Sequence, residues 1–172
     1  MEFYNQYLDE SDSVQLAELL LRENADSTVG HYAPYYFTNV TAIDYFIGKV
    51  TERLEAMNLM DNTIIVFSSD HGEMLGSHGR TGKNVPEMES FTIPFVVQWK
   101  NKLRHRVEDL ILSVPDVMPT LLGLAGLKNE IPESVQGTDY SSILLDAENK
   151  IEKPRAALYL NVQERGIYTG KY

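Results

Sequence analysis

The chain has 172 residues, and 25 acidic against 15 basic side chains leave it with a formal net charge of −10. This length fits one domain of about 100–200 residues, and the acidic balance argues against a nucleic-acid-binding surface, which needs clustered basic side chains. Because the sequence has no cysteine, it holds no disulfide, no thiolate metal site and no cysteine nucleophile. No apolar run approaches the roughly 18–20 residues of a transmembrane helix, so we expect no membrane span.

The first third of the chain has the apolar spacing of helices. Residues 13–21 predict a short helix with Ser13 as its N-cap, and residues 24–34 are polar and turn-like. A long helix is predicted over residues 35–58, where apolar positions recur at three- and four-residue intervals. These positions are Val40, Ile43, Ile47, Val50 and Leu54.

Short apolar runs in the rest of the chain predict strands. Residues 63–67 form a β-branched and aromatic run, which is typical of a strand buried on both faces in a parallel sheet. A second strand is predicted over residues 93–99 and a third, shorter one over residues 110–112. The last two are predicted over residues 156–160 and 165–172, and the final strand has no obvious partner.

A further helix is predicted to begin at Val114. Ser113 and Asp116 are both candidates for its cap, and Gly126 is the expected residue just beyond its end. The order of elements is then helix, strand, loop, strand, helix. This order predicts an α/β fold with a mixed or mostly parallel sheet that is flanked by helices.

The loop after the first predicted strand is the strongest candidate for a functional site. Asp70 and His71 follow that strand directly, and open α/β sheets bind ligands at the carboxyl ends of their strands. A carboxylate oxygen and an imidazole nitrogen in one tight turn can bind a single metal ion, and Gly72 would permit such a turn. The alternative is that Asp70 caps the turn and His71 is an ordinary polar residue. The pair alone does not decide between the two.

A lysine follows the same loop. Lys83 lies between the candidate metal loop and the next predicted strand, where its ammonium group can bind an anion as a point charge. Taken singly, it fits a solvated surface lysine equally well. Its position beside the candidate loop is what favours a role in binding.

The segment from Asp61 to Gly79, which contains Ser-Ser-Asp-His-Gly-Glu-Met-Leu-Gly-Ser-His-Gly, resembles a signature of the sulfatase family. That family belongs to the alkaline-phosphatase-like superfamily of metal-dependent hydrolases. The likeness covers about residues 31–172 in the family's order. Its further matches are residues 35–50, Lys83, Glu89–Ser90, residues 93–97, residues 114–127, residues 135–139 and residues 165–172.

This resemblance implies roles for four residues. Asp70 and His71 would be ligands of a divalent cation, and Lys83 would contact the sulfate or phosphate oxygens of the substrate. The family implies Ca²⁺. Mn²⁺ and Zn²⁺ stay open because imidazole suits transition metals better than Ca²⁺, and Mg²⁺ is a further alternative. His78 would either orient the loop from outside the ligand shell or make a structural hydrogen bond.

One part of the family's active site is missing from the sequence. The family's nucleophile is a Cys or Ser in a Cys/Ser-x-Pro/Ala-x-Arg motif, the Cys being converted to formylglycine, and an adjacent Asp pair completes the metal site. Neither the motif nor the Asp pair occurs here. We therefore expect a partial sulfatase fold that is inactive alone, with formylglycine in an N-terminal part outside this chain. Residues 1–30 would be a lead-in, residues 31–155 the C-terminal part of the α/β domain, and residues 156–172 strands that lead into a small C-terminal subdomain.

Three functions remain open at this point. The leading interpretation is part of a sulfuric ester hydrolase that acts on a sulfate ester in the full-length protein. The alternatives are a phosphonate or phosphate ester hydrolase of the same superfamily and a non-catalytic α/β binding module. Surface left bare by the missing part would favour oligomers. The compartment stays undecided among periplasm, extracellular space and cytoplasm.

Overall fold

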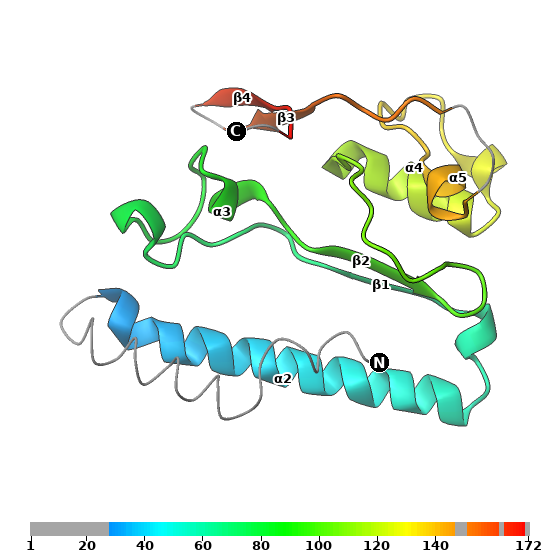
Figure 1. Ribbon diagram of the computed structural model, residues 1–172, viewed down its shortest axis with the longest axis horizontal. Coiled ribbons are helices and arrows are strands. Elements are labelled where there is room, and N and C mark those ends of the chain that lie inside the picture. Colours follow the sequence, from blue (N-terminus) through cyan, green and yellow to red (C-terminus); the bar gives the residue numbers. More distant parts are fainter. Residues whose placement is uncertain (1–27, 147–150, 162–163, 171–172) are drawn as a thin grey trace. The chain divides into compact units, whose positions relative to one another are not determined.

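The computed structural model describes residues 28–146, 151–161 and 164–170 (Figure 1). The described residues form two compact units, and each is presented by itself: one has residues 28–58 with residues 73–83, and the other has residues 59–72 with the described residues from 84 onward. The helix predicted over residues 13–21 lies outside the described residues. The elements, with η for a 3₁₀ helix, are α2 (Thr28–Ala56), η1 (Met60–Asn62), β1 (Ile64–Ser68), η2 (Ser77–Gly79), α3 (Met88–Phe91), β2 (Phe95–Trp99), α4 (Val114–Leu124), η3 (Lys128–Glu130), α5 (Ser141–Leu144), β3 (Ala157–Leu160) and β4 (Arg165–Tyr168).

Helix α2 confirms the long helix that the apolar spacing predicts. It begins at Thr28 rather than Tyr35, so the turn-like interpretation of residues 28–34 is wrong. Pro34 favoured that interpretation, yet its fixed φ is compatible with a helix and its missing N–H removes only one helical hydrogen bond. Among the described residues, no helix combines the length and the apolar character that crossing a bilayer requires.

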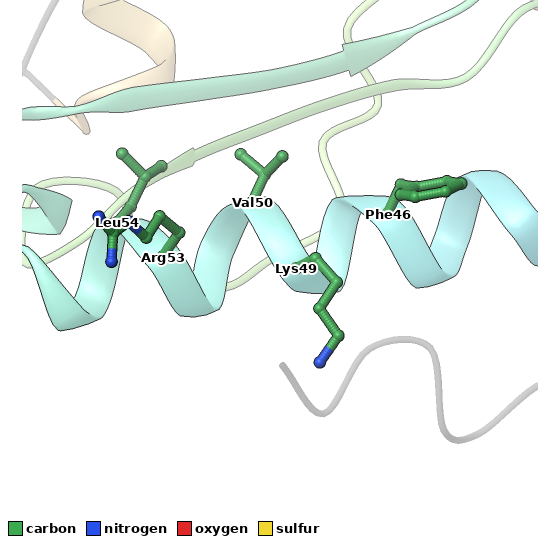
Figure 2. A pocket seen from close by; sticks show the side chains of 5 residues that line it. All are labelled: Phe46, Lys49, Val50, Arg53 and Leu54. Atoms are coloured by element: carbon green, nitrogen blue, oxygen red, sulfur yellow. The ribbon is translucent and has the colours of Figure 1, made fainter.

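The apolar side of α2 lies largely at the surface. Val40, Ile43 and Val50 are 49%, 50% and 57% exposed. An open hollow of about 310 Å³ lies along this helix and is lined by five side chains, which Figure 2 labels: Phe46, Lys49, Val50, Arg53 and Leu54. The apolar spacing therefore predicted the helix correctly, although Val40, Ile43 and Val50 on its apolar side are exposed.

Strands β1 and β2 pair in antiparallel fashion, with Ile64 opposite Trp99 and Ser68 opposite Phe95. Both strands begin or end within two residues of their predicted bounds. At one end the indole N–H of Trp99 donates to the carbonyl of Asp61 (3.2 Å), and at the other the Ser68 hydroxyl donates to the carbonyl of Pro94 (2.9 Å). The parallel neighbour that the apolar run of β1 suggested is not present in the described residues, where β1 pairs with β2 alone. Residues 69–94 connect the two strands and contain the candidate loop.

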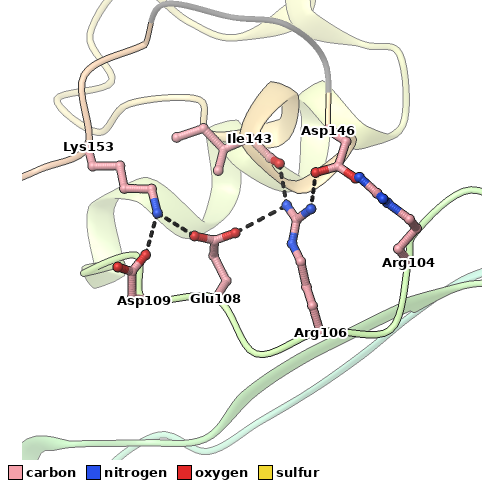
Figure 3. A network of polar contacts seen from close by, with 7 residues as sticks. All are labelled: Arg104, Arg106, Glu108, Asp109, Ile143, Asp146 and Lys153. Atoms are coloured by element: carbon pink, nitrogen blue, oxygen red, sulfur yellow. Dashed lines mark hydrogen bonds and ion pairs between the residues drawn. The ribbon is translucent and has the colours of Figure 1, made fainter.

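The strand predicted over residues 110–112 is wrong. The N–H of Leu112 donates to the carbonyl of Leu110 (3.0 Å), so the backbone closes a tight turn instead of pairing with a neighbouring strand. Charged side chains hold the segment before this turn, as Figure 3 shows. Arg106 donates to the carbonyl of Ile143 (2.6 Å) and pairs with Glu108 (3.1 Å), which also accepts a hydrogen bond from Lys153 (2.6 Å). Arg104 and Arg106 pair with Asp146, and Lys153 with Asp109.

Helix α4 begins and ends as predicted. The carboxylate of Asp116 accepts hydrogen bonds from the N–H and hydroxyl of Ser113 at the N-cap (3.0 and 2.6 Å), so the two candidate caps act together. At the other end Gly126 has φ of +76°. Its N–H and that of Leu127 donate to the carbonyls of Gly123 and Leu122, which is the pattern of a Schellman cap.

The same helix holds the loop that follows it. Asp116 also accepts a hydrogen bond from the N–H of Thr138 (2.8 Å), and the fully buried Thr120 accepts one from the N–H of Tyr140 (3.1 Å). Gly137 passes so close to Pro115 that a Cβ there would lie under 3.0 Å from its carbonyl oxygen. The loop from residue 137 to α5 is therefore fixed along α4 by its backbone.

Strands β3 and β4 form an antiparallel hairpin, so the last predicted strand does have a partner. Its side chains Tyr159 and Tyr168 contact the ring of Phe91 in α3, with ring centroids 5.1 and 6.2 Å apart. Aromatic contacts of this kind contribute about 0.5–1.5 kcal/mol each beyond the area they bury. The hairpin is thereby docked on the short helix that precedes β2.

We predict that Asp116→Ala lowers the free energy of unfolding by about 1–3 kcal/mol, because it removes a helix cap and leaves the N–H of Thr138 without its acceptor. Chemical denaturation measures the difference. Glu133→Ala, at an exposed position in the loop after α4, is the control and should change stability by less than about 0.5 kcal/mol. Equal losses in the two variants would contradict the role given to Asp116.

Candidate functional site

The candidate site begins where β1 ends. Because β1 stops at Ser68, the next residues leave the strand pair as a loop, and Asp70 and His71 stand at its start. The side chain of Asp70 is 83% exposed, whereas that of His71 is 38% exposed. The structure thus brings these two predicted ligands together at the carboxyl end of the strand.

Hydrogen bonds orient the carboxylate of Asp70. Its Oδ1 accepts from the N–H of His71 (3.0 Å) and lies 3.3 Å from the hydroxyl of Ser69, which donates to the carbonyl of His71 (2.9 Å). Loss of solvent contact by itself would raise the pKa of Asp70, but the backbone N–H groups, the attraction of His71 and the Ser69 hydroxyl together outweigh it and lower that pKa. Asp70 is therefore a carboxylate at neutral pH, which is the form that binds cations.

The imidazole of His71 has one nitrogen committed to the backbone. Nδ1 lies 2.7 Å from the carbonyl oxygen of Gly72, and because a carbonyl can only accept, Nδ1 carries a proton. Nε2 lies 3.3 Å from Oδ2 of Asp70. In the tautomer with its proton on Nδ1, Nε2 and Oδ2 both present lone pairs to the same region. A hydrogen bond from Nδ1 to a carbonyl is the usual way in which proteins direct Nε2 toward a metal.

This arrangement fits a divalent cation with two protein ligands. Oδ2 and Nε2 lie 3.3 Å apart and would together offer a carboxylate oxygen and an imidazole nitrogen to one ion. Within the described ranges, no cluster of three or more His, Asp or Glu side chains is placed to hold an ion. Asp70 and His71 can therefore supply two positions of a coordination shell, and the others need different groups.

Gly72 attaches the loop to α3. Its N–H donates to the carbonyl of Ser90 (2.9 Å), and a Cβ at this position would lie well under 3.0 Å from the carbonyl oxygen of Glu89. Ser90 is buried, and its hydroxyl accepts a hydrogen bond from the N–H of Val85 (3.3 Å). The site loop and α3 thus approach so closely that only glycine fits between them.

The rest of the loop, residues 73–83, closes on itself within the other unit. The carboxylate of Glu73 accepts from the N–H of Gly82 (2.6 Å) and of Leu75 (3.2 Å), and the N–H of Met74 donates to the carbonyl of Gly82 (2.8 Å). Met74 is the buried centre of this segment, 2% exposed. The two predicted residues of the segment, His78 and Lys83, are both exposed, and His78 has φ of +54°.

The structure therefore groups the predicted site residues in two sets. Asp70 and His71 are placed together, and His78 and Lys83 lie in the closed segment 73–83, which belongs to the other unit. Sequence reasoning did not assign a role to Ser69, although its place beside Asp70 was a usable signal. It also missed the anchor at Ser90, which follows from tertiary contact rather than from a local pattern.

The sequence matches the family model described as Sulfatase over residues 2–127. An endo-4-O-sulfatase of Bacteroides thetaiotaomicron is 42% identical over 161 residues, which are 91% of this chain and 31% of that protein. A solved structure from work on the metabolism of multiple glycosaminoglycans by the same organism superposes with a TM-score of 0.81 at 37% identity, over 93% of this chain and 38% of the other. The chain thus spans about a third of the length of these relatives.

A more distant likeness concerns the fold alone. The phosphonate monoester hydrolase of Agrobacterium radiobacter superposes with a TM-score of 0.66 at 24% identity, over 79% of this chain and 28% of that structure. These neighbours confirm the predicted α/β fold of the alkaline-phosphatase-like kind.

We predict that Gly72→Ala and Gly48→Ala change stability in opposite directions. The methyl group at residue 72 would strike the backbone of Glu89, which cannot rotate away, so the free energy of unfolding should fall by about 2–4 kcal/mol. Gly48 lies inside α2, and no atom beyond its own stretch of helix lies within 4 Å of an added Cβ. Alanine there should therefore raise the free energy of unfolding by up to about 1 kcal/mol. Thermal and chemical unfolding of both variants measures this, and a neutral Gly72→Ala would contradict the close approach.

Proposed function

The chain belongs to the sulfatase family, and we therefore propose that it forms part of a metal-dependent sulfuric ester hydrolase and supplies part of its metal and sulfate-binding site. The observation that carries this proposal is the Asp70–His71 pair, in which Oδ2 and Nε2 lie 3.3 Å apart at the carboxyl end of β1. A non-catalytic module that binds a metal would use the same pair, so turnover by the whole protein is what separates the two functions.

In the proposed site, Asp70 and His71 hold one divalent cation. When bound, the cation supplies positive charge near the oxygens of the ester, where negative charge grows during attack on sulfur. Asp70 contributes its carboxylate, and the hydrogen bond from Nδ1 of His71 to the Gly72 carbonyl directs Nε2 toward the ion. Ca²⁺ is proposed from the family. The imidazole ligand keeps Mn²⁺ and Zn²⁺ as alternatives, and the Asp70 carboxylate keeps Mg²⁺.

Lys83 is proposed to contact the sulfate oxygens as a positive point charge. Its side chain is exposed and follows Gly82, whose N–H is bound by the carboxylate of Glu73. This hydrogen bond gives the backbone before Lys83 a defined course. His78, exposed at φ of +54°, is proposed to orient the loop rather than to touch the substrate.

The nucleophile is proposed to lie outside these 172 residues. The sequence has neither cysteine nor a Ser-x-Pro/Ala-x-Arg motif, and the relatives are about three times as long as their match to this chain. We expect the isolated chain to be inactive for this reason. We also propose that the isolated chain self-associates through exposed apolar surface, such as the side of α2 in Figure 2.

The proposed substrate class is sulfated glycans. The relative with 42% identity is named an endo-4-O-sulfatase, and the structure with a TM-score of 0.81 comes from work on glycosaminoglycan metabolism. A 4-O-sulfated glycosaminoglycan is therefore the first natural substrate to test.

We predict that Asp70→Ala, made in the whole protein that contains this chain, lowers kcat on a sulfate ester by more than about 100-fold. Mutation of a residue that hydrogen-bonds a metal ligand typically lowers metal affinity or activity about 10–100-fold. Loss of the ligand itself should lower activity more. Elemental analysis of the purified variant should show reduced metal content. Asp44→Ala, an exposed aspartate of α2, is the matched control and should keep both activity and metal. Full metal occupancy with unchanged turnover in Asp70→Ala would refute the ligand role.

A second prediction separates the reaction classes. The whole protein should hydrolyse an aryl sulfate and release sulfate from a 4-O-sulfated glycosaminoglycan, with a kcat/KM on aryl sulfate above that on phenylphosphonate. The isolated chain, assayed beside it, should show no turnover. A strong preference for phenylphosphonate would replace the sulfatase assignment by the phosphonate alternative, and turnover by the isolated chain would contradict the external nucleophile.

A further inference from the structure

The loop of residues 73–83 is closed at a neck where its two ends lie side by side. The N–H of Met74 donates to the carbonyl of Gly82 across this neck (2.8 Å). All of the loop belongs to one compact unit. Lys83, which is proposed to contact sulfate, directly follows Gly82 in the sequence. The contacts at the neck therefore bear on where the backbone of Lys83 lies.

The carboxylate of Glu73 joins the two ends of the loop at the same neck. Its Oε1 accepts from the N–H of Gly82 (2.6 Å) on one side and from the N–H of Leu75 (3.2 Å) on the other. Glu73 is half-buried. Because a carboxylate oxygen accepts stronger hydrogen bonds than a neutral carbonyl does, this side chain holds the neck more firmly than a further backbone pair would.

Gly82 is held at both of its peptide groups. Its N–H belongs to the peptide with Thr81 and is bound by Glu73. Its carbonyl belongs to the peptide with Lys83 and is bound by Met74. A peptide that is held by one hydrogen bond can still turn about that bond, and a glycine, here with φ of +82°, resists such turning little. The bond from Glu73 restricts this motion because it fixes the peptide on the other side of the glycine.

The second bond of the Glu73 carboxylate is made at a strained position. Leu75 has φ of +42°, a conformation that a bulky side chain rarely adopts. Its N–H is bound by Glu73, and beyond it the N–H of Gly76 donates to the carbonyl of Arg80 (2.8 Å). The carboxylate thus holds the loop at a point from which the backbone would otherwise relax.

From this geometry we infer that Glu73 is a positioning residue, whose carboxylate closes the neck of the loop and thereby fixes the Gly82 backbone from which Lys83 continues. The inference rests on the proposed role of Lys83 in binding sulfate, and it adds a residue that is not among the predicted site residues. It requires the reach of the side chain rather than its charge, because the amide oxygen of a glutamine accepts the same two hydrogen bonds.

Two substitutions separate the reach of Glu73 from its charge. Glu73→Gln removes the charge and keeps an acceptor oxygen at the same distance from the backbone. Glu73→Asp keeps the charge but draws the carboxylate back by one methylene group, away from the N–H of Gly82. Glu73→Ala is a second variant without reach, for use if the aspartate does not fold. Glu55→Gln and Glu55→Asp, at an exposed position of α2 in the same unit, are the matched controls.

The first measurement is hydrogen exchange of the Gly82 N–H in the whole protein, followed by mass spectrometry, and it needs no activity. Loss of a hydrogen bond to a carboxylate should raise this exchange rate about tenfold or more in Glu73→Asp, and by less than about threefold in Glu73→Gln. The Glu55 variants should leave the rate unchanged. Equal rates in Glu73→Asp and the unsubstituted protein would overturn the inference.

The second measurement asks whether Glu73 acts through Lys83. Glu73→Asp should lower kcat/KM on a sulfate ester about tenfold in the unsubstituted protein and less than about twofold when Lys83→Ala is already present. Glu73→Gln should keep kcat/KM within about threefold of the unsubstituted value.

Two kinds of failure are distinguishable in this second measurement. If Lys83→Ala lowers kcat/KM but Glu73→Asp causes equal losses in the two backgrounds, or Glu73→Gln loses as much as Glu73→Asp, Glu73 does not position Lys83 and the inference alone is overturned. If Lys83→Ala by itself leaves kcat/KM unchanged, the proposed role of Lys83 is wrong and the inference falls with it.

Discussion

The close approach of two backbones at Gly72 is the constraint on which the described part of the candidate site depends. The N–H of Gly72 binds the carbonyl of Ser90, and there is no room for a side chain beside Glu89. This contact joins the end of β1, where Asp70 and His71 stand, to α3. Through Phe91 the same short helix carries the β3–β4 hairpin. Two segments far apart in the sequence, the end of β1 and the β3–β4 hairpin, thus both contact a helix of one turn.

The sequence predicted well what is encoded locally. The strands on either side of the site loop follow from short β-branched and aromatic runs, and α4 follows from Ser113, Asp116 and Gly126, whose capping roles depend on immediate neighbours. The pairing of Asp70 with His71 is also local, because adjacent residues in one turn cannot lie far apart. The contacts of Glu73 are local as well, because backbone N–H groups of its own loop hold its carboxylate.

What the sequence did not predict depends on tertiary contact. No local pattern shows that Asn161 binds the carbonyl of Asn84 or that Ser90 accepts from Gly72. The early start of α2 was missed because a proline in the sequence normally marks a helix boundary, whereas Pro34 lies inside α2. The apolar run at residues 110–112 was taken for a strand because periodicity cannot distinguish a paired strand from a half-buried turn. The roles of His78 and Lys83 stay predictions.

The tryptophan at the end of β2 has a practical consequence. Trp99 is the one tryptophan of the chain, and its indole N–H donates to the Asp61 carbonyl where β1 and β2 close. Its fluorescence therefore reports the integrity of the strand pair that carries the site loop, with no contribution from another indole in these residues. Loosening of β1 against β2 would shift the emission as the indole gains water, while changes confined to the β3–β4 hairpin would leave it constant. The fold thus contains its own optical probe of the β1–β2 pair.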